Sequence, residues 1–190
     1  MISLKINFQI PRFVTSMPQA RHRFAGGKPY KTLNWRKKGM VIKMKNMKLE
    51  KCLSEYNDII KENDNIYRDT VKKFGLSECA FWILYVLRTG SGKITQTDIC
   101  ESLYQPKQTV NSALKKLEDD GLIELIYDGD HRSKRIKLTA KGVFFSEKTA
   151  DKVIMAEHKA IDGLTESEQR QFITLFHKYT DLLRLHLSDI

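Results

Sequence analysis

The hydrophobic period of the chain changes at Gly121, and this change limits the fold more than any other feature of the sequence. Before Gly121, apolar residues recur every three or four positions, as they do in amphipathic helices. After it, residues 122–127 (LIELIY) and 135–138 (RIKL) have the pattern of two strands, joined by a turn at Asp128-Gly129-Asp130. The sequence therefore predicts a mainly α protein with one small β-hairpin.

Two longer helices are predicted first. The earlier one covers about 47–73, where apolar residues lie at helical spacing, and it ends near Gly75. The next covers 78–89, with Ser77 as its N-terminal cap. Because its AFWILYVL run is apolar on every side, we expect this second helix to form the buried centre of the domain.

Two short helices joined by a tight turn are predicted next. The motif Thr95-x-x-Asp98 is similar to a capping box and starts the first of them. Gln105 is expected to close that helix, because a residue preceding proline avoids helical conformations. Pro106 then suits the first turn of the second short helix. The inward-facing residues of that helix are Val110, Leu114 and Leu117.

Two further helices are predicted after the hairpin, over about 140–161 and 165–187. The apolar side of the first is Val143, Phe144, Ala150, Val153 and Ile154. The stripe along the second is Phe172, Leu175, Phe176, Tyr179, Leu182, Leu183 and His186. Too little chain remains to cover this stripe and the first helix, so the sequence predicts a homodimer. Residues 47–75 and 140–190 are interpreted as dimerisation helices.

The net charge of +10 is concentrated in the first 48 residues. They hold 12 of the 33 lysines and arginines and no acidic residue, which leaves 21 basic against 23 acidic residues, a formal −2, in the rest. Three of the four prolines and Gly26-Gly27 also lie there, so residues 1–46 are predicted to be a disordered extension. Three interpretations stay open: a dispensable or wrongly assigned leader, a phosphate-binding arm, and a targeting segment.

Cysteine usage and hydropathy favour a cytoplasmic protein. The three cysteines show no C-x-x-C spacing, which indicates neither a disulfide framework nor a zinc ribbon. The longest apolar run has eight residues, whereas a helix needs ~20 to cross a bilayer, so no membrane span is expected. The sequence contains no G-x-S-x-G, phosphate-loop or H-E-x-x-H motif, so we expect neither an enzyme nor a cofactor.

A helix pair followed by a β-hairpin is a winged helix-turn-helix, and it is predicted for residues 76–139. Its second helix can enter the major groove of DNA, while the wing reaches phosphates or the minor groove. Residues 107–116 carry three lysines and no acid, and residues 131–137 carry four cations. These two basic clusters flank one motif, although residues 49–190 together have a formal net charge of −2. This distribution predicts binding to double-stranded DNA.

Residues 94–142 closely resemble the DNA-binding domain of MarR-family transcription regulators, and the flanking helices follow that family's order over 47–190. The specific parts are Gln108-Thr109-Val110, Leu117-Glu118-x-x-Gly121-Leu122-Ile123, Asp130-x-Arg132 and Leu138-Thr139-x-x-Gly142. The resemblance implies a homodimer on a pseudo-palindromic operator, with half-sites about one helical turn apart. Repression is the default mode. The alternative is a winged-helix module that binds a protein and not specific DNA.

The resemblance also implies roles for individual residues. Arg132 is expected to enter the minor groove, oriented by Asp130, with support from Lys134 and Arg135. The candidates for major-groove contact are Gln108, Thr109, Asn111, Ser112 and Lys115. The candidates for phosphate contact are Thr95, Gln96, Thr97 and Lys107.

Family members often release DNA when an effector changes the dimer geometry, which requires tighter binding to one geometry. The candidates for a small-molecule pocket are Tyr56, Tyr67, Trp82 and Tyr85, although aromatic residues at helical spacing are more often core. Cys52, one turn from Tyr56, is a candidate redox thiol, with an inert thiol as the favoured alternative. Cys79 and Cys100 are interpreted as small core residues. No metal site is predicted, because Glu157-His158 with Asp162 lacks a second cluster of ligands.

Overall fold

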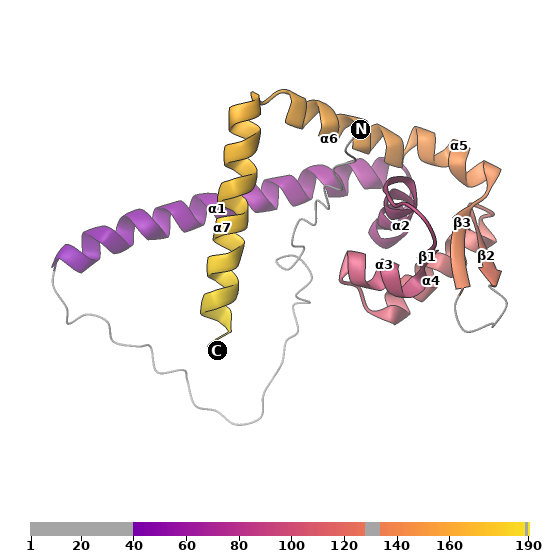
Figure 1. Cartoon of the computed structure of the whole chain (residues 1–190), viewed down its shortest axis with the longest axis horizontal. Helices are drawn as coiled ribbons and strands as arrows, with labels where there is room; N and C mark the ends of the chain where they lie inside the picture. The colour runs from indigo at the N-terminus through magenta and orange to yellow at the C-terminus, as the bar shows by residue number, and fades with distance from the viewer. Residues whose placement is uncertain (1–39, 128–133, 189) are drawn as a thin grey trace. The chain divides into compact units, whose positions relative to one another are not determined.

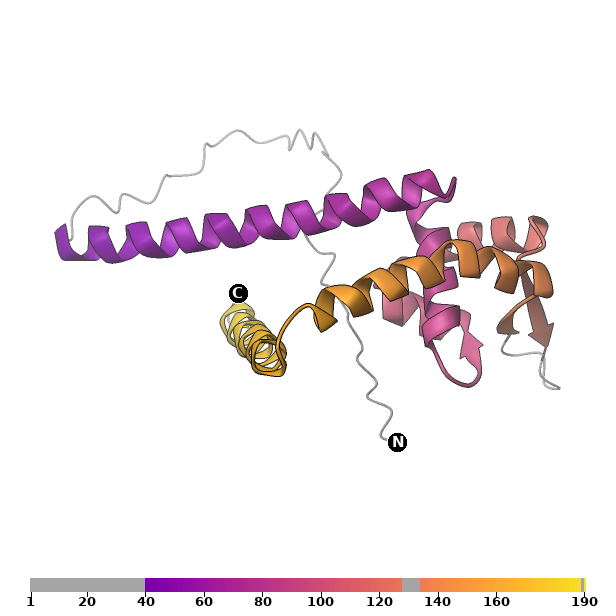
Figure 2. The ribbon, with the colours of Figure 1, turned by 90° about the horizontal axis from the view of Figure 1, so that it is seen from above.

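The computed structural model describes residues 40–127, 134–188 and 190, and these divide into two compact units at Thr70 and Val71. Helix α1 (Met40–Lys73) provides the first unit and is one unbroken helix (Figure 2). It begins before the predicted start at 47, because residues 40–47 (MVIKMKNM) contain no proline or glycine to interrupt it. The rest of the predicted N-terminal extension, residues 1–39, lies outside the described residues.

The second unit contains all the other described elements (Figure 1). They are α2 (Glu78–Thr89), β1 (Ile94–Thr95), α3 (Gln96–Leu103), α4 (Lys107–Asp119), β2 (Ile123–Tyr127), β3 (Lys134–Leu138), α5 (Ala140–Lys148), α6 (Ala150–Asp162) and α7 (Glu166–Leu187). The mainly α fold with a small sheet is therefore confirmed. Within the described ranges, no helix is long and apolar enough to cross a membrane.

Helix α2 lies at the centre of this unit, as its apolar sequence predicts. Phe81, Ile83 and Leu84 are fully buried, and α2 contacts α3, α4, α5, α6 and β3. Ile99 of α3 and Leu117 of α4 are fully buried against the same core. The predicted inward face of α4 is likewise confirmed, and Ala113 joins it.

The helix ends follow the predicted capping residues closely, with two differences. Ser77 caps α2, and Thr95 with Asp98 forms a full capping box at the start of α3. However, α3 ends at Leu103, before the predicted Gln105, because Tyr104 adopts a left-handed conformation with φ of 48°. Pro106 is the N-cap of α4 and not a residue of its first turn.

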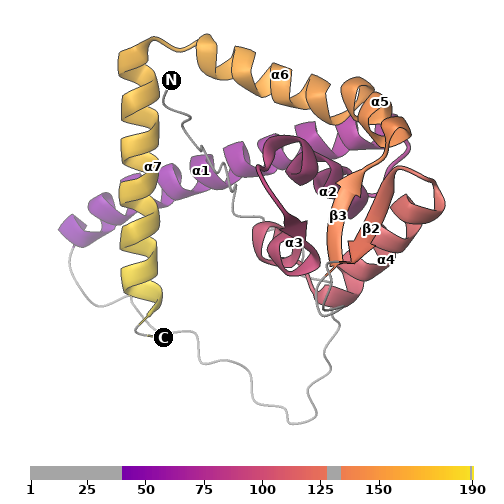
Figure 3. The same cartoon turned by 45° about the vertical axis from the view of Figure 1, so that its right-hand side comes forward.

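The sheet has three strands in the order β1-β3-β2, all antiparallel, one more than the predicted hairpin. Strand β1 has only two residues, which is too short for an alternating pattern to be recognised. Ile136 in the central strand lies between Ile94 and Leu125 and is buried. Figure 3 shows β2 and β3 beside α4, which contacts β2.

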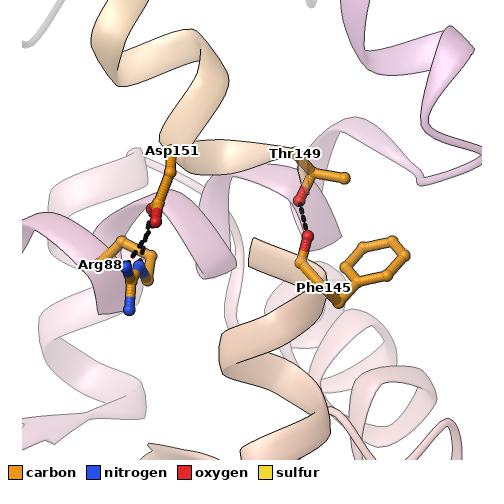
Figure 4. A network of polar contacts seen from close by, with 4 residues as sticks. All are labelled: Arg88, Phe145, Thr149 and Asp151. Atoms are coloured by element: carbon orange, nitrogen blue, oxygen red, sulfur yellow. Dashed lines mark hydrogen bonds and ion pairs between the residues drawn. The ribbon is translucent and has the colours of Figure 1, made fainter. Parts of the chain in front are cut away.

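The predicted single helix over 140–161 is wrong, because the chain breaks at Thr149 into α5 and α6 (Figure 4). Thr149 leaves the helical region, with φ of −127° and ψ of −86°. Its hydroxyl donates to the carbonyl of Phe145 at 2.8 Å, a local bond that competes with helix continuation. Phe144, predicted on the apolar side, is 58% exposed, with the Lys148 ammonium 3.8 Å from the centre of its ring.

Two pairs of polar side chains connect α6 to α2. The Arg88 guanidinium donates to both carboxylate oxygens of Asp151, at 2.7 and 2.5 Å (Figure 4), and the Tyr85 hydroxyl donates to Glu157 at 2.5 Å. The hydrogen bond to Asp151 raises the pKa of Arg88 above its usual range. Helix α7 then starts at a second capping box, formed by Thr165 and Glu168.

At Gly142 the backbone of α5 lies very close to the residue that precedes β2. A β-carbon added there would lie 1.8 Å from the carbonyl oxygen of Leu122, so any larger residue must displace backbone. We expect Gly142→Ala to lower the free energy of unfolding by about 1–3 kcal/mol, measured by urea denaturation. Gly163→Ala is the matched control, because a β-carbon there meets its nearest atom at 3.4 Å, and its expected change is below about 1 kcal/mol. Equal effects of the two substitutions would contradict the close approach.

Candidate nucleic-acid interface

Helix α4 presents one polar face to solvent, opposite its buried residues. All the predicted contact residues on this helix are exposed: Lys107, Gln108, Thr109, Asn111, Ser112 and Lys115. Lysine, amide and hydroxyl groups can hydrogen-bond to base edges and phosphates. No acidic residue lies among them before Glu118, so the face attracts anions along most of its length.

Two of the predicted contact residues bind each other across the helix pair. Gln96, the first residue of α3, donates from Nε2 to Oδ1 of Asn111 at 2.5 Å. The same nitrogen lies 3.5 Å from the carbonyl oxygen of Lys107, where α4 begins. Gln96 therefore links the start of α3 to the first turns of α4 by side-chain hydrogen bonds. The sequence pattern does not reveal this role.

The hydroxyl of Thr95 is used within the chain. It donates to Oδ2 of Asp98 at 2.7 Å and accepts from the Asp98 backbone nitrogen at 3.3 Å. The backbone hydrogen bond from Thr95, together with its hydroxyl, lowers the pKa of Asp98. Thr97, two residues further along the chain, is exposed, and its phosphate contact remains a prediction.

Other polar groups on α4 are partly engaged. The Ser112 hydroxyl donates to the carbonyl of Gln108 at 3.1 Å, so its oxygen lone pairs remain available to accept a hydrogen bond from a ligand. Lys116 forms an ion pair with Asp120 at 3.3 Å, whereas Lys115 points to the exposed face without an ion pair within the described part of the chain. Lys115 is therefore the more available cation for a nucleic acid.

The described part of the wing carries the predicted Lys134 and Arg135. The Lys134 ammonium lies 4.9 Å from the centre of the Tyr127 ring, and the hydrogen bond with Tyr127 raises the lysine's pKa. Tyr127 was not predicted to have this role. Arg135 pairs with Thr95 of β1 in the sheet, and its Nε is buried without a hydrogen-bond partner in the described structure. Asp130 and Arg132 lie outside the described residues.

The candidate sensor residues occupy both units. Trp82 and Tyr85 lie on α2 with ring centres 5.1 Å apart, and Tyr85 is the residue that binds Glu157. Tyr56 and Tyr67 are half-buried on α1, and Cys52 is exposed there. Cys79 and Cys100, predicted in the core, are only half-buried. Among the described residues, no group of three or more potential metal ligands is clustered.

Known proteins are similar to this chain in sequence and in fold. Residues 74–133 match the model of the MarR family. The uncharacterized HTH-type transcriptional regulator YwoH of Bacillus subtilis is 27% identical over 111 residues, which are 58% of this chain and 80% of YwoH.

Solved structures agree on the fold. A MarR family regulator from Neisseria meningitidis superposes with a TM-score of 0.60 at 22% identity, over 72% of this chain and 96% of that one. Staphylococcus aureus MepR in a complex with DNA gives 0.56 at 24% identity, over 67% and 93%. The resemblance seen in the sequence is confirmed: residues 74–133 match the MarR-family model, and the chain shares the fold of solved MarR-family regulators.

The capping box at Thr95 gives a prediction for stability and its pH dependence. We expect Thr95→Ala to cost about 1 kcal/mol near pH 7, measured by urea denaturation. The folded-state pKa of Asp98 is lowered, so its stabilising contribution is fully present above the ordinary pKa of an unfolded aspartate and is lost as the pH falls through the lower, folded-state pKa. The deficit of Thr95→Ala should therefore shrink at acidic pH. Thr97→Ala, an exposed neighbour on the same turn, is the control and should change little.

Proposed function

We propose that this protein is a sequence-specific regulator of transcription that binds double-stranded DNA as a homodimer on a pseudo-palindromic operator. The observation that carries the proposal is the exposed face of α4, which holds three lysines and several hydrogen-bonding groups. Each protomer would place α4 in one major groove, with the two half-sites about one helical turn apart. The cations of β3 would approach the flanking backbone.

The dimer part of the proposal is supported by apolar residues that the single chain leaves exposed. None of the α7 residues 166–187 is buried in the described structure, although the helix carries an apolar stripe. Leu175 is 63% exposed and Leu182 46% exposed, and on α1 Leu49 is 67% exposed. Apolar stripes of this length on a helix surface are typical of interfaces between subunits.

Repression by blocking polymerase is the mode that we propose, with release by a small-molecule effector. A protein that binds two half-sites covers about 20 base pairs, enough to occlude a promoter element. The tyrosines and tryptophan at positions 56, 67, 82 and 85 stay our candidates for the effector pocket, and Cys52 our candidate for redox control. An effector acts only if it favours one geometry of the dimer.

The first experiment is a selection from random duplex DNA with the full chain, followed by gel-shift titration at ~150 mM salt with excess nonspecific competitor. At this salt concentration weak phosphate contacts are screened, so retained binding reports specific recognition. A palindromic consensus bound by a dimer supports the proposal. Binding without any sequence preference, or none at all, would contradict it and favour the protein-binding alternative.

Lys115 and Lys116 provide a matched pair of charge removals. We expect Lys115→Ala to weaken binding to the selected operator by about 1–3 kcal/mol, because it removes a base-edge or phosphate contact from the exposed face. Lys116→Ala removes the same charge one residue later, but that ammonium is already paired with Asp120, so its expected effect is smaller. Titration of both variants on one operator measures the difference, and equal losses would refute the assignment.

The apolar stripe of α7 gives a prediction for assembly. We expect Leu182→Glu to convert the dimer into monomers, because a carboxylate would have to be buried unpaired in the interface. Sedimentation equilibrium measures the change in mass. Thr174→Glu places the same group at an exposed position off the stripe and should leave the dimer intact. A dimeric Leu182→Glu variant would show that α7 does not form the interface.

A further inference from the structure

The hydrogen bond between Gln96 and Asn111 fixes which end of the Asn111 amide is available to a ligand. A backbone carbonyl only accepts hydrogen bonds, so the Gln96 atom facing Lys107 O must be the donor Nε2. That nitrogen also faces Asn111 at 2.5 Å, so the facing atom of Asn111 must be its acceptor, Oδ1. The orientation of both amides follows from one backbone oxygen.

The other end of the Asn111 amide is Nδ2, which carries two N–H donors. Within the described part of the chain, Nδ2 has no hydrogen-bond partner. Asn111 is exposed on the face of α4 that carries the other candidate base contacts. An asparagine held in this way turns its Oδ1 toward Gln96, which takes one of the two lone pairs of that oxygen, and leaves both donors of Nδ2 for a ligand.

We propose that Gln96 is a specificity-determining residue that acts through Asn111, so that α4 selects a guanine at the contacted position. This inference rests on the proposed function. A free asparagine pairs bidentately with adenine, donating to N7 and accepting from N6, and the second of these bonds would have to share Oδ1 with the hydrogen bond from Gln96. Guanine presents two acceptors, N7 and O6, which match the two donors of Nδ2. Thymine presents one acceptor, O4, and cytosine presents a donor in the major groove.

Gln96, which the sequence predicts as a phosphate contact, uses its amide nitrogen inside the helix pair. Both hydrogens of its Nε2 are directed within the helix pair, toward Asn111 and toward Lys107 O. Gln96 is half-buried, whereas the neighbouring Thr97 is exposed. Gln96 thus acts as a positioning residue for Asn111, and its removal should change base preference more than overall affinity.

The test measures base preference with the full chain. Asn111→Ala first identifies the contacted position, as the one whose preference disappears in selections from random duplex DNA. At that position, we expect wild type to favour guanine over adenine by about five- to tenfold in competition titrations, the value of one hydrogen bond. Gln96→Met removes the donor and frees Oδ1, so the preference should fall to about twofold or shift to adenine. Thr97→Met is the control and should keep the wild-type preference.

A second variant keeps the proposal falsifiable if Gln96→Met fails to fold, as judged by thermal unfolding. Asn111→Asp retains an oxygen for Gln96 but replaces the two donors with an acceptor, so preference should move from guanine toward cytosine, which donates from N4. The inference is overturned if the position favours adenine in wild type, or if Gln96→Met or Asn111→Asp retains the guanine preference. In either case a palindromic consensus would leave the proposed function standing, whereas wild type that selects no sequence would overturn both.

Discussion

Burial of the apolar helix α2 is the interaction on which the second unit depends. Phe81, Ile83 and Leu84 are fully buried, and the helices α3, α4, α5 and α6 all contact α2. Burying such side chains contributes about 1.5–3 kcal/mol each, so no surface contact approaches their combined effect. The orientation of α4, whose outer face is proposed to meet DNA, is therefore set from inside by its packing against α2.

The same helix connects DNA recognition to the proposed dimer. Arg88 and Tyr85 project from α2 and bind Asp151 and Glu157 on α6, which leads into α7. Through these pairs α6, which leads into α7, is joined to the helix against which α4 packs. The break at Thr149 sets the direction of α6, so a local backbone feature determines the point from which α7 starts.

Parts of the interface were accessible to sequence reasoning because they rest on local rules. Capping at Ser77 and Thr95, the inward face of α4 and the basic wing strand all follow from short-range patterns. The contact of Gln96 with Asn111 did not, since nothing in two sequence positions 15 apart shows that one amide faces the other. Strand β1 was not predicted from the sequence for a related reason, because its two residues become a strand only by pairing with β3.

The sequence by itself determined the order of elements, the helix boundaries marked by caps, the buried centre and the polar face of α4, because each depends on periodicity or on residues within one turn. Tertiary structure alone decided the third strand and the close approach at Gly142. It also decided that Gln96 orients Asn111 and does not stand free on the surface. These features arise where segments distant in sequence compete for the same space or the same hydrogen bond, and no local pattern records that competition.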